Sequence, residues 1–164
     1  MRFKYCPECG ARLCARILGD EGRVPYCEVC GRPYFDMFSS CVITLVVNEY
    51  GEALLLRQGY ISDKYYNLVS GYISPGESAE EAAEREILEE TGVRIDSLEF
   101  AGTYWFAKKD MLMIGFIARA DKTEPLLSCE VDSAGWYAAD KAIDMVHPEG
   151  SVSHALVKLY LEKQ

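Results

Sequence analysis

The stretch of residues 71–93, GYISPGESAEEAAEREILEETGV, constrains the fold of this chain most strongly, because it carries both ends of a helix and a dense set of carboxylates. Ser78 followed three residues later by Glu81 fits a capping box, which starts a helix. Gly92 suits the left-handed position that commonly ends one. The sequence therefore predicts a helix over residues 79–91.

The glutamates of this helix gather on one side. Glu86 and Glu90 are four residues apart and share a face, and Glu89 adjoins it. Stacked like charges cost roughly 0.2–0.5 kcal/mol per exposed pair, and a divalent cation reverses the sign of that cost. Mg²⁺ prefers a few carboxylates together with water and phosphate oxygens. Arg85 is placed to orient a carboxylate through a bidentate pair. This face predicts a divalent-metal site; the alternative is an ordinary solvated helix face.

A second metal site is predicted near the N-terminus. Cys6-x-x-Cys9 and Cys27-x-x-Cys30 are separated by 17 residues, a spacing typical of zinc sites. The surrounding segment has too few aliphatic residues to build its own core, so a metal would supply the fold. We expect a closed, structural zinc ribbon over residues 1–36, with a redox dithiol as the alternative.

The remaining residues alternate apolar runs with turn signals. Strands are predicted at 41–48, 53–58, 66–72, 98–107, 111–120 and 134–139, and helices at 140–146 and 151–163. The first two strands form a predicted hairpin, and so do the fourth and fifth. This mixture of hairpins and helices favours an α/β sandwich with a mixed sheet over a doubly wound parallel sheet.

Charge and hydropathy exclude some classes of function. The net charge of −9 means that bulk electrostatics would not draw in DNA or RNA, so an anionic substrate needs local cations. No apolar run is long enough to span a membrane, and the N-terminal residues lack the apolar stretch of a secretory signal. We therefore expect a cytoplasmic protein with reduced thiols and no membrane partner.

The fixed positions of residues 71–93 resemble a known pattern, the Nudix box. They are Gly71, five residues, Glu77, seven residues, Arg85-Glu86-Ile87, one residue, Glu89-Glu90, one residue, and Gly92-Val93. The resemblance implies an α/β/α Nudix sandwich over residues 37–164 that uses Mg²⁺ or Mn²⁺. It also implies hydrolysis of a nucleoside diphosphate linked to another moiety.

The same resemblance implies a role for each residue of the box. Glu86, Glu89 and Glu90 would be metal ligands or water-activating bases. Gly71 would offer its backbone carbonyl, while Arg85 and the first glutamate of the box would support the ligands.

A cysteine ribbon directly before this box is similar to the zinc-ribbon NADH pyrophosphatase family. Members of that family hydrolyse NAD(H) to AMP and a mononucleotide, and some remove NAD caps from RNA. The segments LMIGFIARA and EVDSAGWY look like later parts of the same family. Glu130, six residues before Trp136, then aligns with a further acidic metal ligand; the alternative is a loop carboxylate. Because members often dimerise, the resemblance also implies a homodimer.

The chain departs from that family in one segment. The family's substrate motif Ser-Gln-Pro-Trp-Pro-Phe-Pro should fall near GTYWFAKKD, where only Trp105 matches. Tyr104 and Trp105 are predicted to stack a base, with packing in the core as the alternative. Lys108 is predicted to meet a phosphate, with a solvated hairpin tip as the alternative.

Two other readings of the whole chain remain. The substrate could instead be ADP-ribose, FAD or a nucleotide sugar. Alternatively, the chain is a binding module whose ribbon grips nucleic acid or a protein through its basic residues. These are Arg2, Lys4, Arg12, Arg16, Arg23 and Arg32. The complete set of glutamates favours the enzyme, because a sensor does not need all of them.

Overall fold

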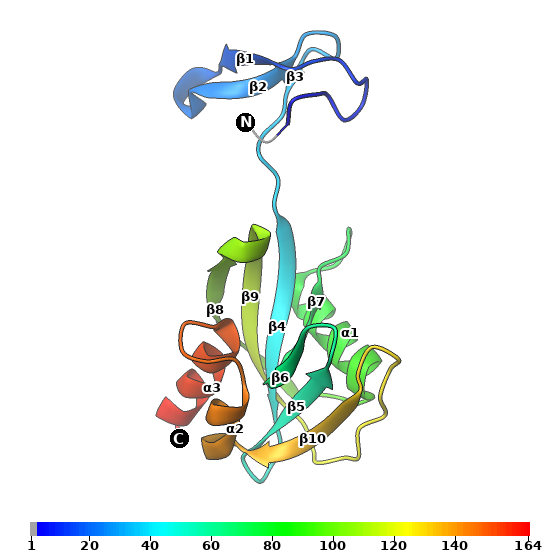
Figure 1. Cartoon of the computed structure of the whole chain (residues 1–164), viewed down its shortest axis with the longest axis vertical. Helices are drawn as coiled ribbons and strands as arrows, with labels where there is room; N and C mark the ends of the chain where they lie inside the picture. The colour runs from blue at the N-terminus through cyan, green and yellow to red at the C-terminus, as the bar shows by residue number, and fades with distance from the viewer. Residues whose placement is uncertain (1–2) are drawn as a thin grey trace. The chain divides into compact units, whose positions relative to one another are not determined.

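The computed structural model describes residues 3–164, so Arg2 lies outside the described residues. The chain divides into two compact units, one ending at Phe38 and the other spanning Ser39–Gln164. Each unit has its own sheet (Figure 1). No helix among the described residues is long and apolar enough to cross a membrane.

The first unit is built on a small antiparallel sheet. Its strands are β1 (Cys14–Ile17), β2 (Arg23–Cys27) and β3 (Arg32–Pro33), in the order β1-β2-β3, and a 3-10 turn at Gly19–Glu21 joins the first two. The buried hydrophobic residues of this unit's cluster are Cys6, Leu13 and Cys27, with Phe3, Ala11, Cys30 and Tyr34 packed against them. So small a cluster, in which cysteines are prominent, is what a metal-dependent fold is expected to have.

The second unit contains a seven-stranded mixed sheet. Its strands are β4 (Ser39–Val47), β5 (Glu52–Gln58), β6 (Ser62–Asn67), β7 (Val69–Tyr72), β8 (Ser97–Phe106), β9 (Met111–Arg119) and β10 (Ser133–Ala138). The main order is β10-β5-β4-β9-β8, with β6 paired to β5 and β7 paired to β4. β4 runs parallel to β9, and the other pairs are antiparallel.

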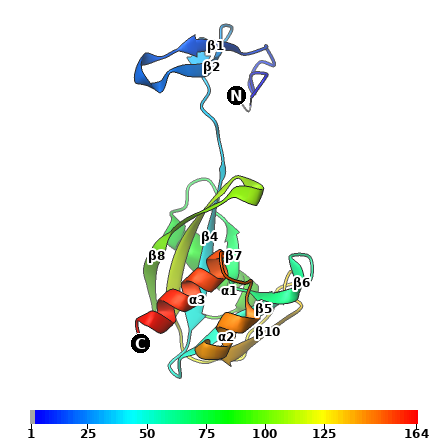
Figure 2. The ribbon, with the colours of Figure 1, turned by 60° about the vertical axis from the view of Figure 1, so that its left-hand side comes forward.

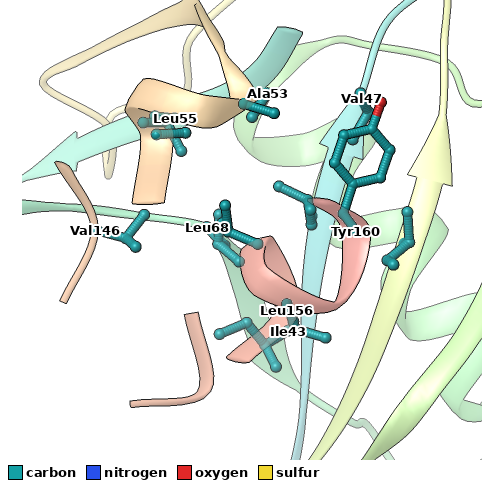
Figure 3. Packing of buried hydrophobic residues seen from close by; sticks show 13 residues of the cluster. Ile43, Val47, Ala53, Leu55, Leu68, Val146, Leu156 and Tyr160 are labelled. Carbon is teal, nitrogen blue, oxygen red and sulfur yellow. The ribbon is translucent and has the colours of Figure 1, made fainter. Parts of the chain in front are cut away.

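Helices cover both faces of this sheet (Figure 2). They are α1 (Ala79–Thr91), α2 (Ala139–Met145) and α3 (Val152–Glu162). Val42 and Val46 of β4 pack in the same clusters as buried residues of α1. The alternate residues Ile43, Leu45 and Val47 pack with α2 and α3, as Figure 3 shows for part of that cluster. The predicted α/β/α sandwich with a mixed sheet is thereby confirmed.

The predicted box helix is confirmed at both ends. The Ser78 hydroxyl accepts the backbone N–H of Glu81, the Glu81 carboxylate accepts the backbone N–H of Ser78, and α1 covers Ala79–Thr91. Gly92 ends the helix with a left-handed φ of 68°. The predicted hairpin over 98–120 is also confirmed as β8 and β9, although a bulge interrupts its register between Phe100 and Gly102.

The single strand predicted at 66–72 is wrong. The chain forms two strands there, β6 and β7, which are separated at Leu68. β6 pairs with β5, whereas β7 pairs with β4. Local sequence reports an extended backbone but not which neighbour each half bonds, because pairing is set by residues distant in sequence.

Candidate active site

One guanidinium ties the start of the site together. Arg85 donates from Nε and Nη2 to the two carboxylate oxygens of Glu77, at 3.0 and 2.7 Å. Its Nη1 donates to Glu86 Oε1 at 2.8 Å and to Glu89 Oε2 at 3.1 Å. Its Nη2 also donates to the backbone carbonyl of Tyr72 at 3.1 Å. The bidentate partner of Arg85 is therefore Glu77, and the helix glutamates each receive one bond.

Glu77 is held as an anion by this arrangement. The Arg85 guanidinium and the backbone N–H of Ser74 lower the pKa of the Glu77 carboxyl to about 2. The Ser74 N–H donates to Glu77 at 2.6 Å, which fixes the loop that leads from β7 into α1. Glu77 thus joins the loop to the helix and lies where the box pattern places a supporting residue.

Gly71 lies directly under the Glu86 carboxylate. It pairs with Val42 in the sheet, and a Cβ built on it would fall 1.9 Å from the carboxylate carbon of Glu86. Any side chain at this position would therefore displace Glu86. Close approach, rather than a special backbone angle, explains why glycine is needed here.

Glu90 is the buried carboxyl of the group. Only 4% of the residue is exposed, and Oε1 accepts a hydrogen bond from Gln58 Nε2 at 3.0 Å. Burial raises the pKa of Glu90 to about 7; the Gln58 bond opposes this shift, and the negative charges of Glu86 and Glu130 add to it. Glu90 is therefore close to the balance between its neutral and charged forms at physiological pH.

Glu130 reaches the site on a loop that is bonded to the end of α1. The backbone N–H of Leu126 donates to the Thr91 carbonyl at 2.8 Å, and that of Ser128 donates to the Glu90 carbonyl at 3.3 Å. These carbonyls are left free by the end of the helix. The Glu130 N–H then donates to the Ser128 hydroxyl at 3.3 Å. The structure thus brings Glu130 near the box glutamates, although no local pattern links it to them.

The arrangement fits a divalent cation in two respects. Glu90 Oε2 is buried and has no hydrogen-bond partner within the described part of the chain, which is an unusual state for a carboxylate oxygen. The space over Gly71 is filled by the Glu86 carboxylate, so glycine here preserves a cradle for an acidic ligand. Carboxylate oxygens are the ligands that Mg²⁺ and Mn²⁺ favour.

The three box glutamates are not equivalent. The side chains of Glu86 and Glu89 are 15% and 61% exposed, so Glu89 lies at the rim and its bond in the described chain is to Arg85. Glu86 and Glu90 face the sheet, and Glu130 joins them from the loop. We call Glu86, Glu90 and Glu130 the acidic group, because the charges of the other two act on Glu90; Glu89 lies at its rim.

The predicted base-stacking pair does not form one platform. Tyr104 packs against the core cluster beneath α3, and its hydroxyl donates to the Ala101 carbonyl at 3.2 Å. Burial raises the pKa of Tyr104. Trp105 is the next residue along β8, so it points to the opposite face, where it is 51% exposed. The ring of Tyr104 therefore packs in the core, whereas Trp105 is half exposed.

Lys108 and Lys109 form the 3-10 turn at the tip of the β8–β9 hairpin and are both exposed. Burial and the charge of Lys108 lower the pKa of His147, so Lys108 lies toward the segment before α3. Burial and the charge of Glu86 raise the pKa of the Cys41 thiol to about 11, and the charge of Lys109 opposes this shift. Lys109 and Glu86 therefore both influence the charge state of the Cys41 thiol.

Three residues near the acids were not singled out from the sequence. Gln58 ends β5 on the same face as Leu54 and Leu56, and a polar residue at an inward position of an apolar strand was a usable signal. Tyr60, which is 70% exposed, has its pKa raised by burial and by the charges of the site's glutamates, Glu90 first. Tyr72, which is 57% exposed, follows the glycine that underlies Glu86. No local pattern marked either tyrosine.

The four ribbon cysteines converge. The sulfur atoms of Cys6, Cys9, Cys27 and Cys30 all lie within 4.8 Å of one another and could hold a metal ion. The glycines that follow the two pairs have left-handed φ values of 73° and 70°, which closes the tight turn around each pair. Hydrogen bonding to Cys9 and burial raise the pKa of the Cys30 thiol to about 12. This is the behaviour of a thiol crowded by other sulfurs, and a divalent metal would favour the thiolates instead.

The sheet is packed between α1 and the α2–α3 pair, and the glutamates of α1 lie beside Gly71 of β7. This combination is typical of the Nudix class of proteins. Comparison with protein families agrees, since the family model described as the NUDIX domain matches residues 37–157. This chain belongs to the NUDIX domain family, as the box predicted.

Similar proteins fall in the same family. A protein of Pseudomonas aeruginosa (strain LESB58) named NAD-capped RNA hydrolase NudC is 31% identical over 162 residues, covering 98% of this chain and 56% of its own length. The chain thus spans about half the length of the curated relatives it matches. The crystal structure of a NUDIX hydrolase from Nitrosomonas europaea has a TM-score of 0.73 at 19% identity, covering 98% of this chain and 92% of its own. The NUDIX domain of Shewanella oneidensis NrtR, complexed with ADP ribose, has a TM-score of 0.65 at 17% identity, covering 84% and 93%.

Proposed function

We propose that this chain is a divalent-metal-dependent pyrophosphohydrolase for a nucleoside diphosphate linked to another moiety. The proposed substrate is a dinucleotide such as NAD(H), free or as the 5′ cap of an RNA, which yields AMP and a mononucleotide on cleavage of free NAD(H). The observation that carries the proposal is the buried Oε2 of Glu90, which has no hydrogen-bond partner among the described residues and which feels the negative charges of Glu86 and Glu130. The relatives named NAD-capped RNA hydrolase NudC support the substrate.

In this proposal the acids hold Mg²⁺ or Mn²⁺ and the surrounding residues position them. The proposed ligands are Glu86, Glu90 and Glu130. Glu89 lies at the rim of the site, and the Gly71 backbone lies beside the ligands. A bound divalent ion supplies neutralisation of phosphate oxygens and a lower pKa for coordinated water. In the metal-free protein the Glu90 carboxyl has a pKa near 7, and a bound divalent ion would favour its charged form.

Arg85 acts through the acids in the same scheme. Its bonds to Glu77 hold the loop, and its bond to Glu86 orients that carboxylate toward β7. The substrate side of the site would be completed by Trp105 and by the lysines of the hairpin tip, of which Lys108 was predicted to meet a phosphate. Tyr104 is the weakest member of that predicted set because its ring is committed to the core.

The cysteine cluster is proposed to bind structural zinc. Four thiolates around one zinc ion form the closed type of zinc site, which leaves no position for substrate. A homodimer and a cytoplasmic location remain part of the proposal; the location is supported by the seven free cysteines.

One contact in the ribbon supports the alternative function of nucleic-acid binding. The exposed Arg16 guanidinium lies 4.5 Å from the centroid of the partly buried Tyr26 ring, and an arginine held over an aromatic ring is a feature that single-stranded nucleic acid can contact. Salt-sensitive RNA binding that survives Glu90→Gln would favour this second function.

The test is a substrate panel with matched variants. Wild type, Glu90→Gln and Glu84→Gln would each be incubated with Mg²⁺ or Mn²⁺ and with NADH, NAD⁺, NAD-capped RNA, ADP-ribose, FAD and a nucleotide sugar. Products would be resolved by mass spectrometry. Glu84 is exposed on the same helix, so its variant controls for loss of one negative charge. AMP and nicotinamide mononucleotide from NAD⁺, lost only in Glu90→Gln, are expected. Faster cleavage of another substrate would redirect the specificity, and no turnover with either metal would overturn the enzyme.

A further inference from the structure

We infer that Gln58, which lies outside the box helix, is a positioning residue that orients the Glu90 carboxylate for the divalent cation. This inference rests on the proposed function, because it concerns the same acidic group. It adds a residue that the box does not contain and that comes from a different element, the end of β5.

The contact is short and hidden from water. Gln58 is 1% exposed, and its Nε2 donates to Glu90 Oε1 at 3.0 Å across 32 residues of sequence. The same amide nitrogen lies 3.4 Å from the Tyr60 hydroxyl. Both ends of the Gln58–Glu90 bond are therefore fixed by rigid elements, a strand of the sheet and the helix packed on it.

The bond selects one orientation of the carboxylate. The terminal torsion of a glutamate is broad, so an isolated carboxylate does not settle on one plane. Donation to Oε1 removes this freedom and leaves Oε2 as the buried oxygen without a hydrogen-bond partner in the described chain. That oxygen is the one available to an ion.

The choice of a neutral donor matters as much as its position. Glu86 receives its hydrogen bond from the Arg85 guanidinium, which offsets part of its charge. Glu90 receives its bond from an amide, which carries no net charge. The amide therefore orients Glu90 without competing with a cation for its charge.

Residues on both sides of Gln58 are bonded to the loop that carries Glu130. The Gly59 N–H donates to Asp132 Oδ2 at 2.7 Å, and the Asp132 N–H donates to the Arg57 carbonyl at 2.8 Å. One short segment of β5 thus sets the orientation of Glu90 and anchors the loop of Glu130. Two acids that are 40 residues apart in sequence are positioned from the same place.

The test measures metal binding directly. Gln58→Met keeps the length of the side chain and removes the donor. Binding of Mn²⁺ would be followed through the electron paramagnetic resonance signal of the free ion. We expect the dissociation constant for Mn²⁺ to rise about 10–100-fold, the usual effect of losing a residue that supports a metal ligand. At saturating Mn²⁺ and substrate, most of kcat should return, because the ligands themselves remain.

Thr44→Val is the matched control. Thr44 is 1% exposed, and its hydroxyl is also unpartnered within the described residues, so this variant removes a buried polar group without touching Glu90. It should change the Mn²⁺ dissociation constant less than about twofold. Gln58→Asn, which keeps the amide but shortens the chain, replaces Gln58→Met if that variant does not fold, and it should weaken Mn²⁺ binding as well.

The possible failures separate cleanly. If wild type binds Mn²⁺ and hydrolyses a dinucleotide but the Gln58 variants bind Mn²⁺ equally well, only this inference is overturned. The same holds if Thr44→Val weakens binding as much as Gln58→Met does. If wild type neither binds Mn²⁺ nor hydrolyses any substrate of the panel, the proposed function fails and takes the inference with it.

Discussion

Glu86 and Glu90 lie one helical turn apart and carry the same functional group, yet their surroundings make them different acids. Glu86 is bonded to a guanidinium and is partly exposed. Glu90 is buried against the sheet, and it accepts a side-chain hydrogen bond from the neutral amide of Gln58. Desolvation penalises the charged form of Glu90. The same helix face therefore carries Glu86, which is paired with a guanidinium, and Glu90, which is hydrogen-bonded to a neutral amide.

The raised pKa of Glu90 predicts how the metal-free protein responds to pH. The carboxyl ionises near 4.5 in the unfolded chain and near 7 in the folded one, so the folded state holds the extra proton between these values. The contribution of Glu90 to stability is therefore fully present below about pH 4.5 and is lost as pH rises through 7. The loss is on the order of 3 kcal/mol.

Urea unfolding of metal-free wild type, Glu90→Gln and Glu84→Gln from pH 5 to pH 8 measures this effect. Glu90→Gln should flatten the decline in unfolding free energy, whereas Glu84→Gln should keep it. Addition of Mn²⁺ should restore stability to the wild type at pH 8. An unchanged decline in Glu90→Gln would assign the pH dependence to another group.

Gly71→Ala tests the close approach beneath Glu86. The new methyl group would occupy the place of the carboxylate, and the side chain would have to swing toward solvent. We expect kcat for the dinucleotide to fall about 10–100-fold, as for other losses of ligand support. The melting temperature should change little, because an exposed glutamate is easily solvated. If Gly71→Ala keeps the wild-type kcat, hydrolysis does not require the Glu86 carboxylate in the position over Gly71.

At the scale of elements, the capping box of α1 has a counterpart that makes a controlled comparison possible. Ser78 accepts the N–H of Glu81 at the start of α1, and Ser151 accepts the N–H of His154 at the start of α3. Replacing either serine with alanine should cost about 1 kcal/mol of folding free energy. That corresponds to a fall of about 2–4 °C in melting temperature, measured by calorimetry.

The two variants should differ in activity. Ser78 adjoins Glu77, whose bonds to Arg85 organise the acids, so Ser78→Ala should lower kcat more than Ser151→Ala does. Equal activity in the two variants would mean that the loop before α1 is held by Glu77 and Arg85 without help from the cap.

Elements whose ends are marked locally were predictable, and contacts between elements were not. The limits of α1 follow from Ser78 and Gly92, and the Nudix box supplied the identity of its acidic face. The division of residues 66–72 between two strands depends on β4 and β5, which the segment itself does not encode. The placement of Tyr104 in the core depends likewise on α3 packing over β8.

The same limit applies within the site. Gln58 and Glu90 are distant in sequence, so their hydrogen bond follows from sheet order and helix placement rather than from any motif. Arg85 was expected to orient a carboxylate, but its choice of Glu77 for the bidentate bond required the path of the intervening loop. Residue types near the box could be inferred from the sequence, whereas their pairings required the structure.

At the scale of the whole molecule, two units with different sources of stability share one chain. The unit from Ser39 onward buries a full set of aliphatic residues on both faces of its sheet. The cluster in the ribbon is far smaller and contains three of the four converging cysteines. Metal removal should therefore act on one unit and spare the other.

Cys9→Ser and Cys129→Ser test this independence. Cys9 belongs to the sulfur cluster, while Cys129 is an exposed cysteine of the other unit. Wild type and Cys129→Ser should carry about one zinc per chain by mass spectrometry of the metal, and Cys9→Ser should carry almost none. Trypsin should then cleave Cys9→Ser after the ribbon arginines Arg12, Arg16 and Arg23, and leave a fragment that contains the Nudix unit intact. Because that unit has its own core, the midpoint temperature of its main thermal transition should not change.

Two outcomes would contradict this prediction. A ribbon that resists trypsin without zinc would show that its few apolar contacts are enough to fold it. A lowered temperature of the main transition would show that the two units are coupled in stability.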